Sequence, residues 1–266
     1  MRFWKMNGAG NDFVVLNNLE EHLPAECFPQ VARTLCERHL SIGADGLMVV
    51  DAPTQGGDYK MLFFNSDGSV GEMCGNGARC ICRYAFDHDI AGESMVVETD
   101  AGLVPGKRLS ESQYRVKLNN PGVLDLHRKG DIAYVELGNP GVPHAVAEYA
   151  GDLWADADSL REKMRALRFD PAFPKGANVN FYQVLAPGEV RMLTFERGVE
   201  DFTLACGTGC GSTASVLWLE GKLPGNTLTA HNRGGILKVT VGGERETVTS
   251  IQLEGPTEVV RVLEIG

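Results

Sequence analysis

The sequence has few basic residues, and they do not form a block. It contains 25 Lys and Arg against 35 Asp and Glu, which gives a formal net charge of −10. Affinity for a nucleic-acid backbone depends on clustered cations, so this composition argues against a protein that binds DNA or RNA. It favours a small molecule as the partner.

Long hydrophobic runs are absent as well. No stretch reaches the roughly 18 apolar residues that a membrane-spanning helix needs. The amino terminus, Met1–Lys5, does not lead into the apolar run of about 7–15 residues that is typical of a secretory signal. We therefore expect no association with a membrane and a location in the cytoplasm.

The cysteines do not indicate a disulfide framework. There are seven of them, an odd number, so thiols are the expected state. Cys82 falls on the apolar stripe of a helix expected around residues 78–86 and is interpreted as a core residue. A metal pair formed by Cys80 and Cys82 is the alternative, but the chain has no Cys-x-x-Cys and no histidine spacing that would support zinc. We expect no bound metal.

The chain is long enough for two domains. Its 266 residues fit two domains of about 130 residues each. Hydrophobic residues make up 43% and charged residues 23%, which is near the average of globular proteins, so neither disorder nor a fibrous protein is indicated.

Two segments of the sequence resemble each other. Residues 65–79 and 196–210 each contain a cysteine followed by Gly-x-Gly, and Cys74 and Cys206 lie 132 residues apart. In both copies a strand-like apolar run precedes the cysteine and a helix-periodic segment of small residues follows it. This pattern predicts a duplication into two pseudo-symmetric domains, 1–118 and 119–266, with a site that receives one thiol from each. The last strand of the chain falls in the second of these ranges, with packing on the N-terminal half as the alternative.

Residues 3–17 are expected to form a β-hairpin with a polar tip. Asn11 in that tip has two interpretations: a turn residue that tolerates positive φ, or a side chain that points into a site. Residues 173–181 loosely resemble residues 5–13, which makes Asn178 a second candidate of the same kind.

Two further stretches rich in Gly, Pro and Asn are expected to be irregular. Residues 119–122 form a plausible hinge between the halves, and residues 138–144 a loop that ends at His144. A histidine in such a loop is either a hydrogen-bonded structural residue or a catalyst, and the sequence leaves both open.

A cysteine at the start of a helix can take part in acid–base chemistry. The first amides of a helix bind anions and lower the pKa of a thiol, and the glycines after each cysteine leave those amides uncovered. Two such helices could hold one carboxylate through the amides of Gly75, Asn76, Gly207 and Thr208. The thiols would then flank the adjacent carbon.

That arrangement suits removal of a proton α to a carboxylate on one face and its return on the other. One thiol must be activated while its partner stays protonated, because an unperturbed cysteine is only a few per cent thiolate at neutral pH. The alternative is that both cysteines are small hydrophobic residues that cap two helices. The duplicated placement favours the catalytic interpretation.

At these residues the sequence resembles the diaminopimelate epimerase family of pyridoxal-independent, two-cysteine epimerases. The family signature Asn-x-Asp-Gly-Ser-x4-Cys-Gly-Asn-Gly-x-Arg matches residues 65–79, and residues 5–13, 196–198 and 205–209 match two further motifs. The resemblance runs nearly end to end. It implies an α+β fold of two pseudo-symmetric domains, each a mostly antiparallel sheet wrapped around a central helix.

The resemblance also implies an activity and the residues that carry it. The expected reaction interconverts LL- and meso-diaminopimelate, in lysine and peptidoglycan synthesis, without a cofactor and often in a homodimer. Cys74 and Cys206 would be the acid/base thiols. Substrate would be held by Asn11, Asn65, Gly75, Asn76, Asn178, Glu196, Arg197, Gly207 and Thr208.

Three positions depart from the family pattern. Asn7 stands where many members have histidine, Gly46 where some have glutamine, and Val142 where some have asparagine. These positions concern substrate contacts rather than the acid/base groups. A two-thiol racemase of another amino acid, such as histidine, is therefore the alternative function.

Overall fold

The computed structural model describes residues 1–71, 74–244 and 246–265. The chain folds into two compact units: unit 1 is Met1–Val116 with Gly255–Gly266, and unit 2 is Lys117–Glu254. The C-terminal segment thus belongs with the first half of the chain. The division into domains at residue 118 stays a prediction.

The sheet of unit 1 is mostly antiparallel. Going across it, neighbouring strands pair antiparallel except at β2–β3 and β4–β5, which are parallel. The strands in this order are β17 (Glu258–Glu264), β1 (Arg2–Gly8), β2 (Asn11–Asn17), β3 (Gly46–Asp51), β4 (Tyr59–Asn65), β5 (Ser94–Thr99), β6 (Gly102–Arg108) and β7 (Gln113–Leu118).

The sheet of unit 2 repeats this pattern. Its parallel pairs, β10–β11 and β12–β14, occupy the same places in the order, and the other neighbours are antiparallel. The strands are β8 (Pro121–Lys129), β9 (Ile132–Gly138), β10 (Gly141–Glu148), β11 (Asn178–Ala186), β12 (Glu189–Glu196), β14 (Thr227–Asn232), β15 (Gly235–Gly242) and β16 (Ser250–Pro256), with the short β13 (Asp201–Thr203) beside β12. The predicted duplication is therefore visible in the strand order.

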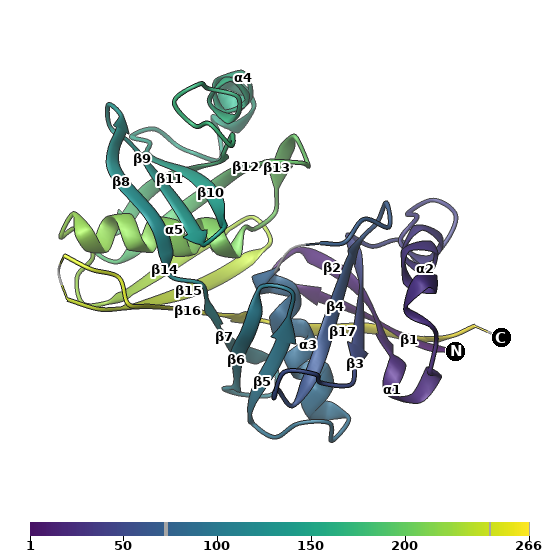
Figure 1. Ribbon diagram of the computed structural model, residues 1–266. Coiled ribbons are helices and arrows are strands. Elements are labelled where there is room, and N and C mark those ends of the chain that lie inside the picture. The colour runs from purple at the N-terminus through teal and green to yellow at the C-terminus, as the bar shows by residue number, and fades with distance from the viewer. Residues whose placement is uncertain (72–73, 245, 266) are drawn as a thin grey trace. The chain divides into compact units, whose positions relative to one another are not determined.

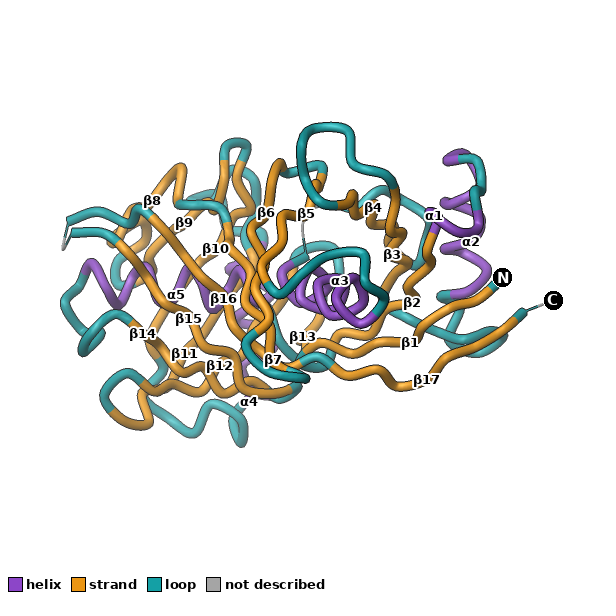
Figure 2. Tube along the Cα trace, turned by 90° about the horizontal axis from the view of Figure 1, so that it is seen from below, coloured by secondary structure: helices purple, strands orange, loops and turns teal. Residues whose placement is uncertain are grey.

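Each sheet curves around one buried helix (Figure 1). In unit 1, α3 (Gly75–Asp87) contacts β1, β2, β3, β5 and β6. In unit 2, α5 (Gly207–Leu219) contacts the equivalent strands β9, β10, β11, β14 and β15. Figure 2 shows α3 with the strands of its own unit around it. The predicted fold class, two similar α+β units with a central helix in each, is confirmed.

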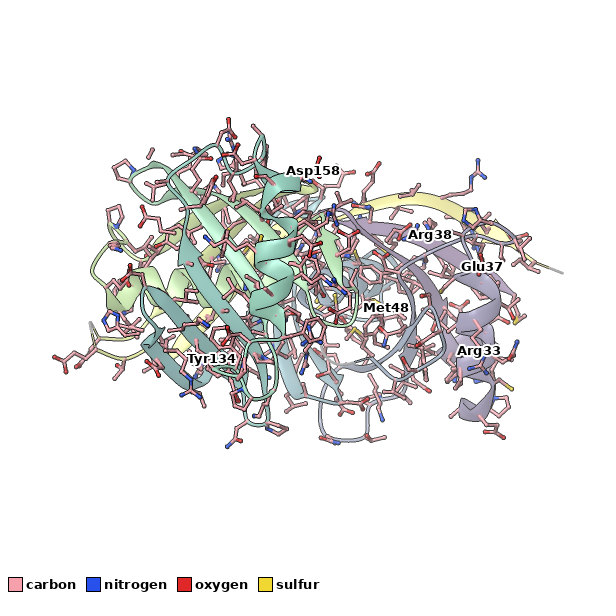
Figure 3. The ribbon with its side chains drawn as sticks, turned by 90° about the horizontal axis from the view of Figure 1, so that it is seen from above. Arg33, Glu37, Arg38, Met48, Tyr134 and Asp158 are labelled. Atoms are coloured by element: carbon pink, nitrogen blue, oxygen red, sulfur yellow. The ribbon has the colours of Figure 1, made fainter. Side chains whose placement is uncertain are left out.

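Small and apolar side chains let these helices pack closely against the strands around them, although α3 also buries Asn76 and Arg79. The predicted stripe of α3 is buried at Ala78, Ile81, Cys82 and Ala85. Glycine allows the closest approach: a Cβ on Gly77 would lie 1.6 Å from Cε of Met48, a residue labelled in Figure 3. Its counterpart Gly209, 132 residues later, would place a Cβ 2.1 Å from Oδ1 of Asn180.

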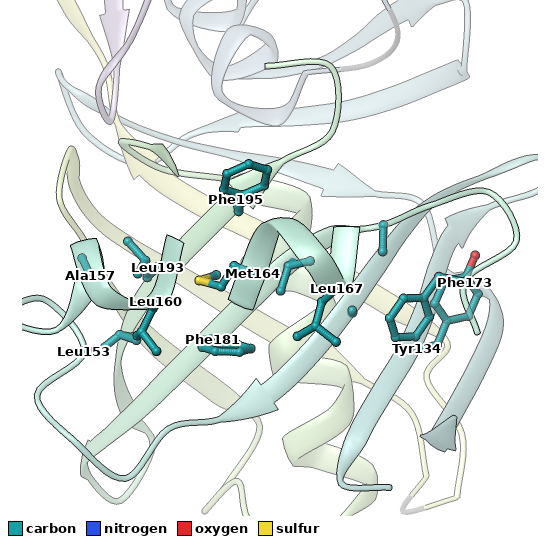
Figure 4. Close-up of a cluster of buried hydrophobic side chains, with 13 residues drawn as sticks. Tyr134, Leu153, Ala157, Leu160, Met164, Leu167, Phe173, Phe181, Leu193 and Phe195 are labelled. Carbon is teal, nitrogen blue, oxygen red and sulfur yellow. The ribbon is translucent and has the colours of Figure 1, made fainter. Parts of the chain in front are cut away.

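A second helix covers the outside of each sheet. In unit 1, α2 (Phe28–Leu35) packs on β3 and β4, preceded by α1 (Asn18–Glu21) and the 3₁₀ helix η1 (Ala25–Cys27). In unit 2, α4 (Ala157–Arg168) packs on β11, β12 and β13. The apolar cluster between α4 and the sheet includes Met164 of α4 with Phe181 and Phe195 of the strands, and it continues to a stacked pair of Tyr134 and Phe173 (Figure 4).

The two segments expected to be irregular are shorter in the structure. Strand β10 begins at Gly141 and includes His144, so the loop is reduced to the turn between Gly138 and Gly141. Pro143 is tolerated because β10 pairs with β9 alone at this point; its pairing with β11 starts at His144. The proposed hinge is shortened in the same way, since β8 starts at Pro121.

None of the helices in the described residues is long and apolar enough to cross a membrane.

The loop between β3 and β4 is organised by one carboxylate. Glu98 accepts hydrogen bonds from the amides of Thr54 (2.6 Å), Gln55 and Gly57 (3.0 Å) and lies almost fully buried. Burial by itself raises the pKa of Glu98, but these backbone donors outweigh it and lower the pKa to about 2. The carboxylate therefore stays ionised in the folded protein under conditions where an ordinary glutamate is protonated.

This lowered pKa gives Glu98 a defined effect on acid stability. Its contribution is complete above its ordinary pKa of 4.5 and is lost as the pH falls towards about 2. We expect Glu98→Gln to flatten the fall in the free energy of unfolding over this pH range, measured by urea denaturation, because the amide does not titrate. Glu111→Gln, at an exposed position of the same unit, is the matched control; equal slopes in the two variants would contradict the assignment.

Candidate active site

The two candidate thiols occupy equivalent positions in the two units. Cys74 is the N-cap residue of α3 with φ −107° and ψ 112°, and Cys206 is the N-cap residue of α5 with φ −121° and ψ 107°. Both helices are 13 residues long and start with the glycine that follows the cysteine. Each cysteine therefore immediately precedes the first turn of a buried helix.

Cys206 is held by its own helix. Its Sγ accepts a hydrogen bond from the backbone N–H of Gly209 (3.3 Å) and lies 3.5 Å from Oγ1 of Thr208. Burial raises the pKa of Cys206 well above its ordinary value, and the negative charge of Glu196 raises it further; the bonds from Thr208 and Gly209 oppose this only in part. The helix start thus lowers the pKa of Cys206 as expected, but burial outweighs it, so the thiol is protonated at neutral pH.

Cys74 is more accessible than Cys206, since it is half-buried. The motif residues Glu72 and Met73 just before it lie outside the described residues. Its backbone C=O accepts a hydrogen bond from the N–H of Ala78 (2.8 Å), the first helical bond of α3. Gly75 and Asn76 follow it in the buried first turn of the helix.

The remaining cysteines belong to the packing. Burial raises the pKa of Cys36, Cys80 and Cys82 to about 12, which leaves these thiols protonated and unreactive. Cys210 is fully buried on α5, and Cys27 is half-buried. Among the described residues no group of three or more His, Cys, Asp or Glu could hold a metal ion.

In unit 1 the structure brings two of the candidates together. Asn76 donates a short hydrogen bond from Nδ2 to Oδ1 of Asn11 (2.6 Å). Asn11 is the first residue of β2, and the positive φ values of this turn belong to Ala9 and Gly10. The interpretation of Asn11 as a positive-φ turn residue was therefore wrong, while its side chain points to the start of α3.

Asn65 lies at the end of β4, where it opens the turn that the signature encodes. Its Nδ2 donates to Oγ of Ser69 (3.0 Å), and Asp67 accepts from both the amide and the hydroxyl of Ser69. Opposite Asn65, across the β3–β4 pair, stands Gly46. The signature residues thus shape a tight turn between the strand and the candidate thiol.

In unit 2 the candidates Asn178, Glu196 and Arg197 form a second group. Oδ1 of buried Asn178 accepts from the backbone N–H of Arg197 (2.8 Å), and the Arg197 guanidinium donates to the C=O of Lys175 (3.3 Å). Lys175 forms an ion pair of 2.7 Å with buried Glu136. Arg197 and Glu196 are half-buried.

His144 is a fully buried residue of the same unit. The amide Nδ2 of Asn180 donates to its Nδ1 (3.1 Å), which places the ring hydrogen on Nε2. Burial lowers the pKa of His144 to about 3, with a smaller contribution from the charge of Arg197, so the imidazole is neutral. Within the described residues Nε2 has no hydrogen-bond partner.

Strand register shows which site residues are counterparts. The first parallel pair is Phe13 with Gly46 in unit 1 and His144 with Asn178 in unit 2. Asn178 thus takes the place of Gly46. The same register makes Val142 the counterpart of Asn11, so the loose sequence likeness of residues 173–181 to 5–13 does not mark equivalent strand positions. In the same way Glu196, at the end of β12, corresponds to Asn65 at the end of β4.

The departures from the family pattern have local structural reasons. A side chain at Gly46 would place its Cβ 2.5 Å from both Cε2 of Phe63 and the C=O of Phe64. Asn7 closes the hairpin turn, because its Oδ1 accepts from the N–H of Gly10 (3.0 Å). Val142 lies in β10 opposite Leu137, where sequence patterns predicted a loop.

Sequence reasoning missed the residues that support these candidates. Asp45 accepts a hydrogen bond from the side chain of Asn11. The side-chain amide of Asn180, on β11, donates to the His144 ring and to the C=O of Ala145, both on β10. Asn180 is fully buried, and a polar residue inside an apolar strand was the signal that could have identified it. Asp45 had no comparable signal, because it resembles any other turn residue before a strand.

The fold is shared with solved structures of two kinds. It matches a phenazine biosynthesis protein of the PhzF family from Bacillus anthracis with a TM-score of 0.70 and 14% identity, over 100% of this chain and 99% of that chain. It matches a hydroxyproline epimerase from Agrobacterium vitis with a TM-score of 0.69 and 16% identity, over 99% of this chain and 91% of that one. The units and their central helices thus define a known class of α+β fold.

Sequence comparison gives the family within that class. The family model described as diaminopimelate epimerase matches residues 3–121 and 134–260. A diaminopimelate epimerase of Aquifex aeolicus is 39% identical over 247 residues, 86% of each chain, and one of a Hydrogenobaculum species is 36% identical over 97% of this chain and 95% of its own. The chain belongs to the diaminopimelate epimerase family and is an epimerase, a member of the isomerases.

Proposed function

We propose that this enzyme interconverts LL- and meso-2,6-diaminopimelate by two-thiol proton transfer at Cα. The observation that carries the proposal is the repeated thiol: in both units a cysteine with nearly the same backbone conformation caps a buried 13-residue helix. Membership of the family supports diaminopimelate as the substrate. We place the reaction in the cytoplasmic synthesis of lysine and peptidoglycan precursors and expect a homodimer.

In the proposed mechanism one thiolate removes the Cα proton and the other thiol donates its proton to the opposite face of the same carbon. One C–H bond breaks and another forms, so the stereocentre inverts without net oxidation or reduction. Burial raises the pKa of Cys206, which supports Cys206 as the proton donor and Cys74 as the base when the reaction starts with Cys206 protonated. The two protonation states are exchanged after each turnover.

The negative charge that develops on the carbanion spreads into the adjacent carboxylate. We assign the amides at the two helix starts, Gly75 and Asn76 with Gly207 and Thr208, to bind this carboxylate. Backbone donors fixed in position stabilise developing charge without reorganising during the reaction. The first amides of a helix have no partner within it, so they suit this role.

The distal end of diaminopimelate carries an ammonium and a carboxylate. We assign Glu196 to the ammonium and Arg197 to the carboxylate, since their charges are complementary and the guanidinium can bind a carboxylate through two hydrogen bonds. Asn11, Asn65 and Asn178 hold the remaining polar groups. Unit 1 would thus contribute neutral amides and unit 2 the charged pair.

A two-thiol racemase of another amino acid is the second candidate. It is favoured by Val142 and Gly46, which provide no polar side chain at positions where some family members do. An inversion assay separates the candidates: purified protein without added cofactor is offered LL-diaminopimelate and a panel of single amino acids including histidine, and the stereoisomers are resolved by chiral chromatography. Inversion confined to diaminopimelate is the expected result. Inversion of another amino acid alone would replace the substrate, and no inversion of any would refute the proposal.

A further inference from the structure

A continuous line of side-chain hydrogen bonds runs through unit 1 and includes two of the candidate site residues, Asn11 and Asn76. Nη2 of Arg79 donates to Oδ1 of Asn76 (2.9 Å), Nδ2 of Asn76 donates to Oδ1 of Asn11 (2.6 Å), and Nδ2 of Asn11 donates to Oδ2 of Asp45 (3.0 Å). Arg79 is fully buried on α3, whereas Asp45 lies in the turn before β3. Along this line Asn11 and Asp45 are 34 residues apart in sequence, and Asn11 and Asn76 are 65 residues apart.

The two ends of this line fix its direction. A guanidinium has donors and no acceptor, while an ionised carboxylate has acceptors and no donor. An asparagine amide can be turned over with little change of shape, but here a reversed Asn76 would set N–H against N–H at Arg79, and a reversed Asn11 would set oxygen against oxygen at Asp45. Each reversal would leave partly buried polar groups without partners, which is costly.

The acceptor end is itself anchored by charge. Asp45 also accepts from the backbone N–H of Asp12 (3.1 Å), and its Oδ1 accepts from Nη2 of Arg38 (2.6 Å), a residue labelled in Figure 3. Arg38 and Lys5 both bind Asp12, at 2.7 Å and 2.6 Å. Asp45 is therefore held between fixed donors and cannot turn away from Asn11 without breaking several contacts.

We propose that Asp45 and, through Asn76, Arg79 are positioning residues that set the amide orientation of Asn11 for the substrate. In this orientation the amide oxygen of Asn11 faces a donor of the chain, so half-buried Asn11 presents an N–H group, which suits a carboxylate and repels an ammonium. The inference rests on the proposed function, because it takes Asn11 to contact the substrate. It adds the reason why this amide acts as a donor.

The variant Asp45→Asn tests this inference in the full-length enzyme. Asparagine has nearly the same shape as aspartate but can also donate, so the acceptor end no longer fixes Asn11. We expect KM for LL-diaminopimelate to rise by roughly tenfold or more, the size of one lost hydrogen bond to a charged group, while kcat changes by less than about threefold. Asp58→Asn is the matched control, because Asp58 also accepts a backbone N–H, from Val96 (2.7 Å), in the same unit. We expect its KM to stay at the wild-type value.

A second readout does not depend on turnover. In protein labelled with ¹⁵N-asparagine, the Nδ2 resonances of Asn11 and Asn76 report their hydrogen bonds; they are assigned with Asn11→Ser and Asn76→Ser. We expect both to shift in Asp45→Asn and to stay in place in Asp58→Asn. A wild-type protein that inverts no substrate would refute the proposed function, and the NMR comparison would still decide the orientation.

Two results would overturn the inference. One is an Asp45→Asn variant whose amide resonances and KM both match those of the wild type. The other is an equal rise of KM in Asp45→Asn and Asp58→Asn, which would mean that loss of any carboxylate in this unit disturbs binding through the fold.

Discussion

Replacement of either Cys74 or Cys206 by serine is expected to lower the rate of epimerisation by roughly 10²–10⁴-fold, the usual contribution of a positioned acid or base. A hydroxyl is far less acidic than a thiol, so it neither removes nor supplies the Cα proton at neutral pH. Serine is close to cysteine in size, so the fold should be retained. Chiral chromatography of the products gives the rate, and circular dichroism with thermal unfolding checks the fold.

Cys27→Ser is the matched control for this pair, because Cys27 is a half-buried thiol of η1 outside the proposed site. It should keep the wild-type rate. Near wild-type turnover in Cys74→Ser or in Cys206→Ser would contradict the two-thiol mechanism. An equal loss in Cys27→Ser would show that the enzyme is sensitive to any change of a thiol.

The second large effect is expected at Arg197. Arg197→Lys keeps the charge but loses the planar fork that binds a carboxylate through two hydrogen bonds. We expect kcat/KM for diaminopimelate to fall by roughly tenfold to a hundredfold, the size of a lost charge-assisted bond. For an amino acid with a single carboxylate that the enzyme inverts, kcat/KM should fall much less, because such a substrate has no distal carboxylate for Arg197 to bind.

The control for this variant is Arg191→Lys on β12, the strand that ends just before Arg197. Arg191 binds Asp152 (2.9 Å) and Gln183 (3.1 Å), and neither residue belongs to the proposed site. Its kinetic constants should stay near the wild-type values. Equal losses of diaminopimelate and of monocarboxylic amino acids in Arg197→Lys would mean that Arg197 does not bind the distal carboxylate.

The two units have the same strand order but carry different chemistry. At the end of β4 stands the neutral Asn65, and at the end of β12 stands the charged Glu196 followed by Arg197. The parallel pair that precedes them carries Gly46 in unit 1 and Asn178 in unit 2. The two units thus keep a cysteine at the same place before the central helix, while the residues at the ends of β4 and β12 differ in charge.

Much of this fold could be predicted because its signals are local. The stripe from Ala78 to Ala85 and the small residues after Cys206 indicate two helices, and the glycines after each cysteine place the helix starts. The offset of 132 residues between the cysteines is enough to indicate the duplication. Features that depend on neighbours in sequence were therefore accessible.

The features that the sequence did not predict depend on contacts between segments that are distant in sequence. The bond between Asn11 and Asn76 and the role of Asp45 arise from strand pairing, which sequence spacing does not give. His144 lies in a strand because β10 pairs with β9 across a tight turn. The high pKa of Cys206 comes from burial, whereas the helix start alone suggested the opposite direction.

The central claim, that one thiol removes the Cα proton and a different thiol returns one, is tested most directly in D₂O. LL-diaminopimelate is converted by the wild-type enzyme for a few per cent of the reaction, and product and remaining substrate are separated and analysed by NMR for deuterium at Cα. Two thiols predict that the first product formed carries deuterium at the inverted centre while the remaining substrate still carries hydrogen. Product that retains the substrate hydrogen, or substrate that exchanges as fast as product forms, would show that a single base acts and would contradict the mechanism.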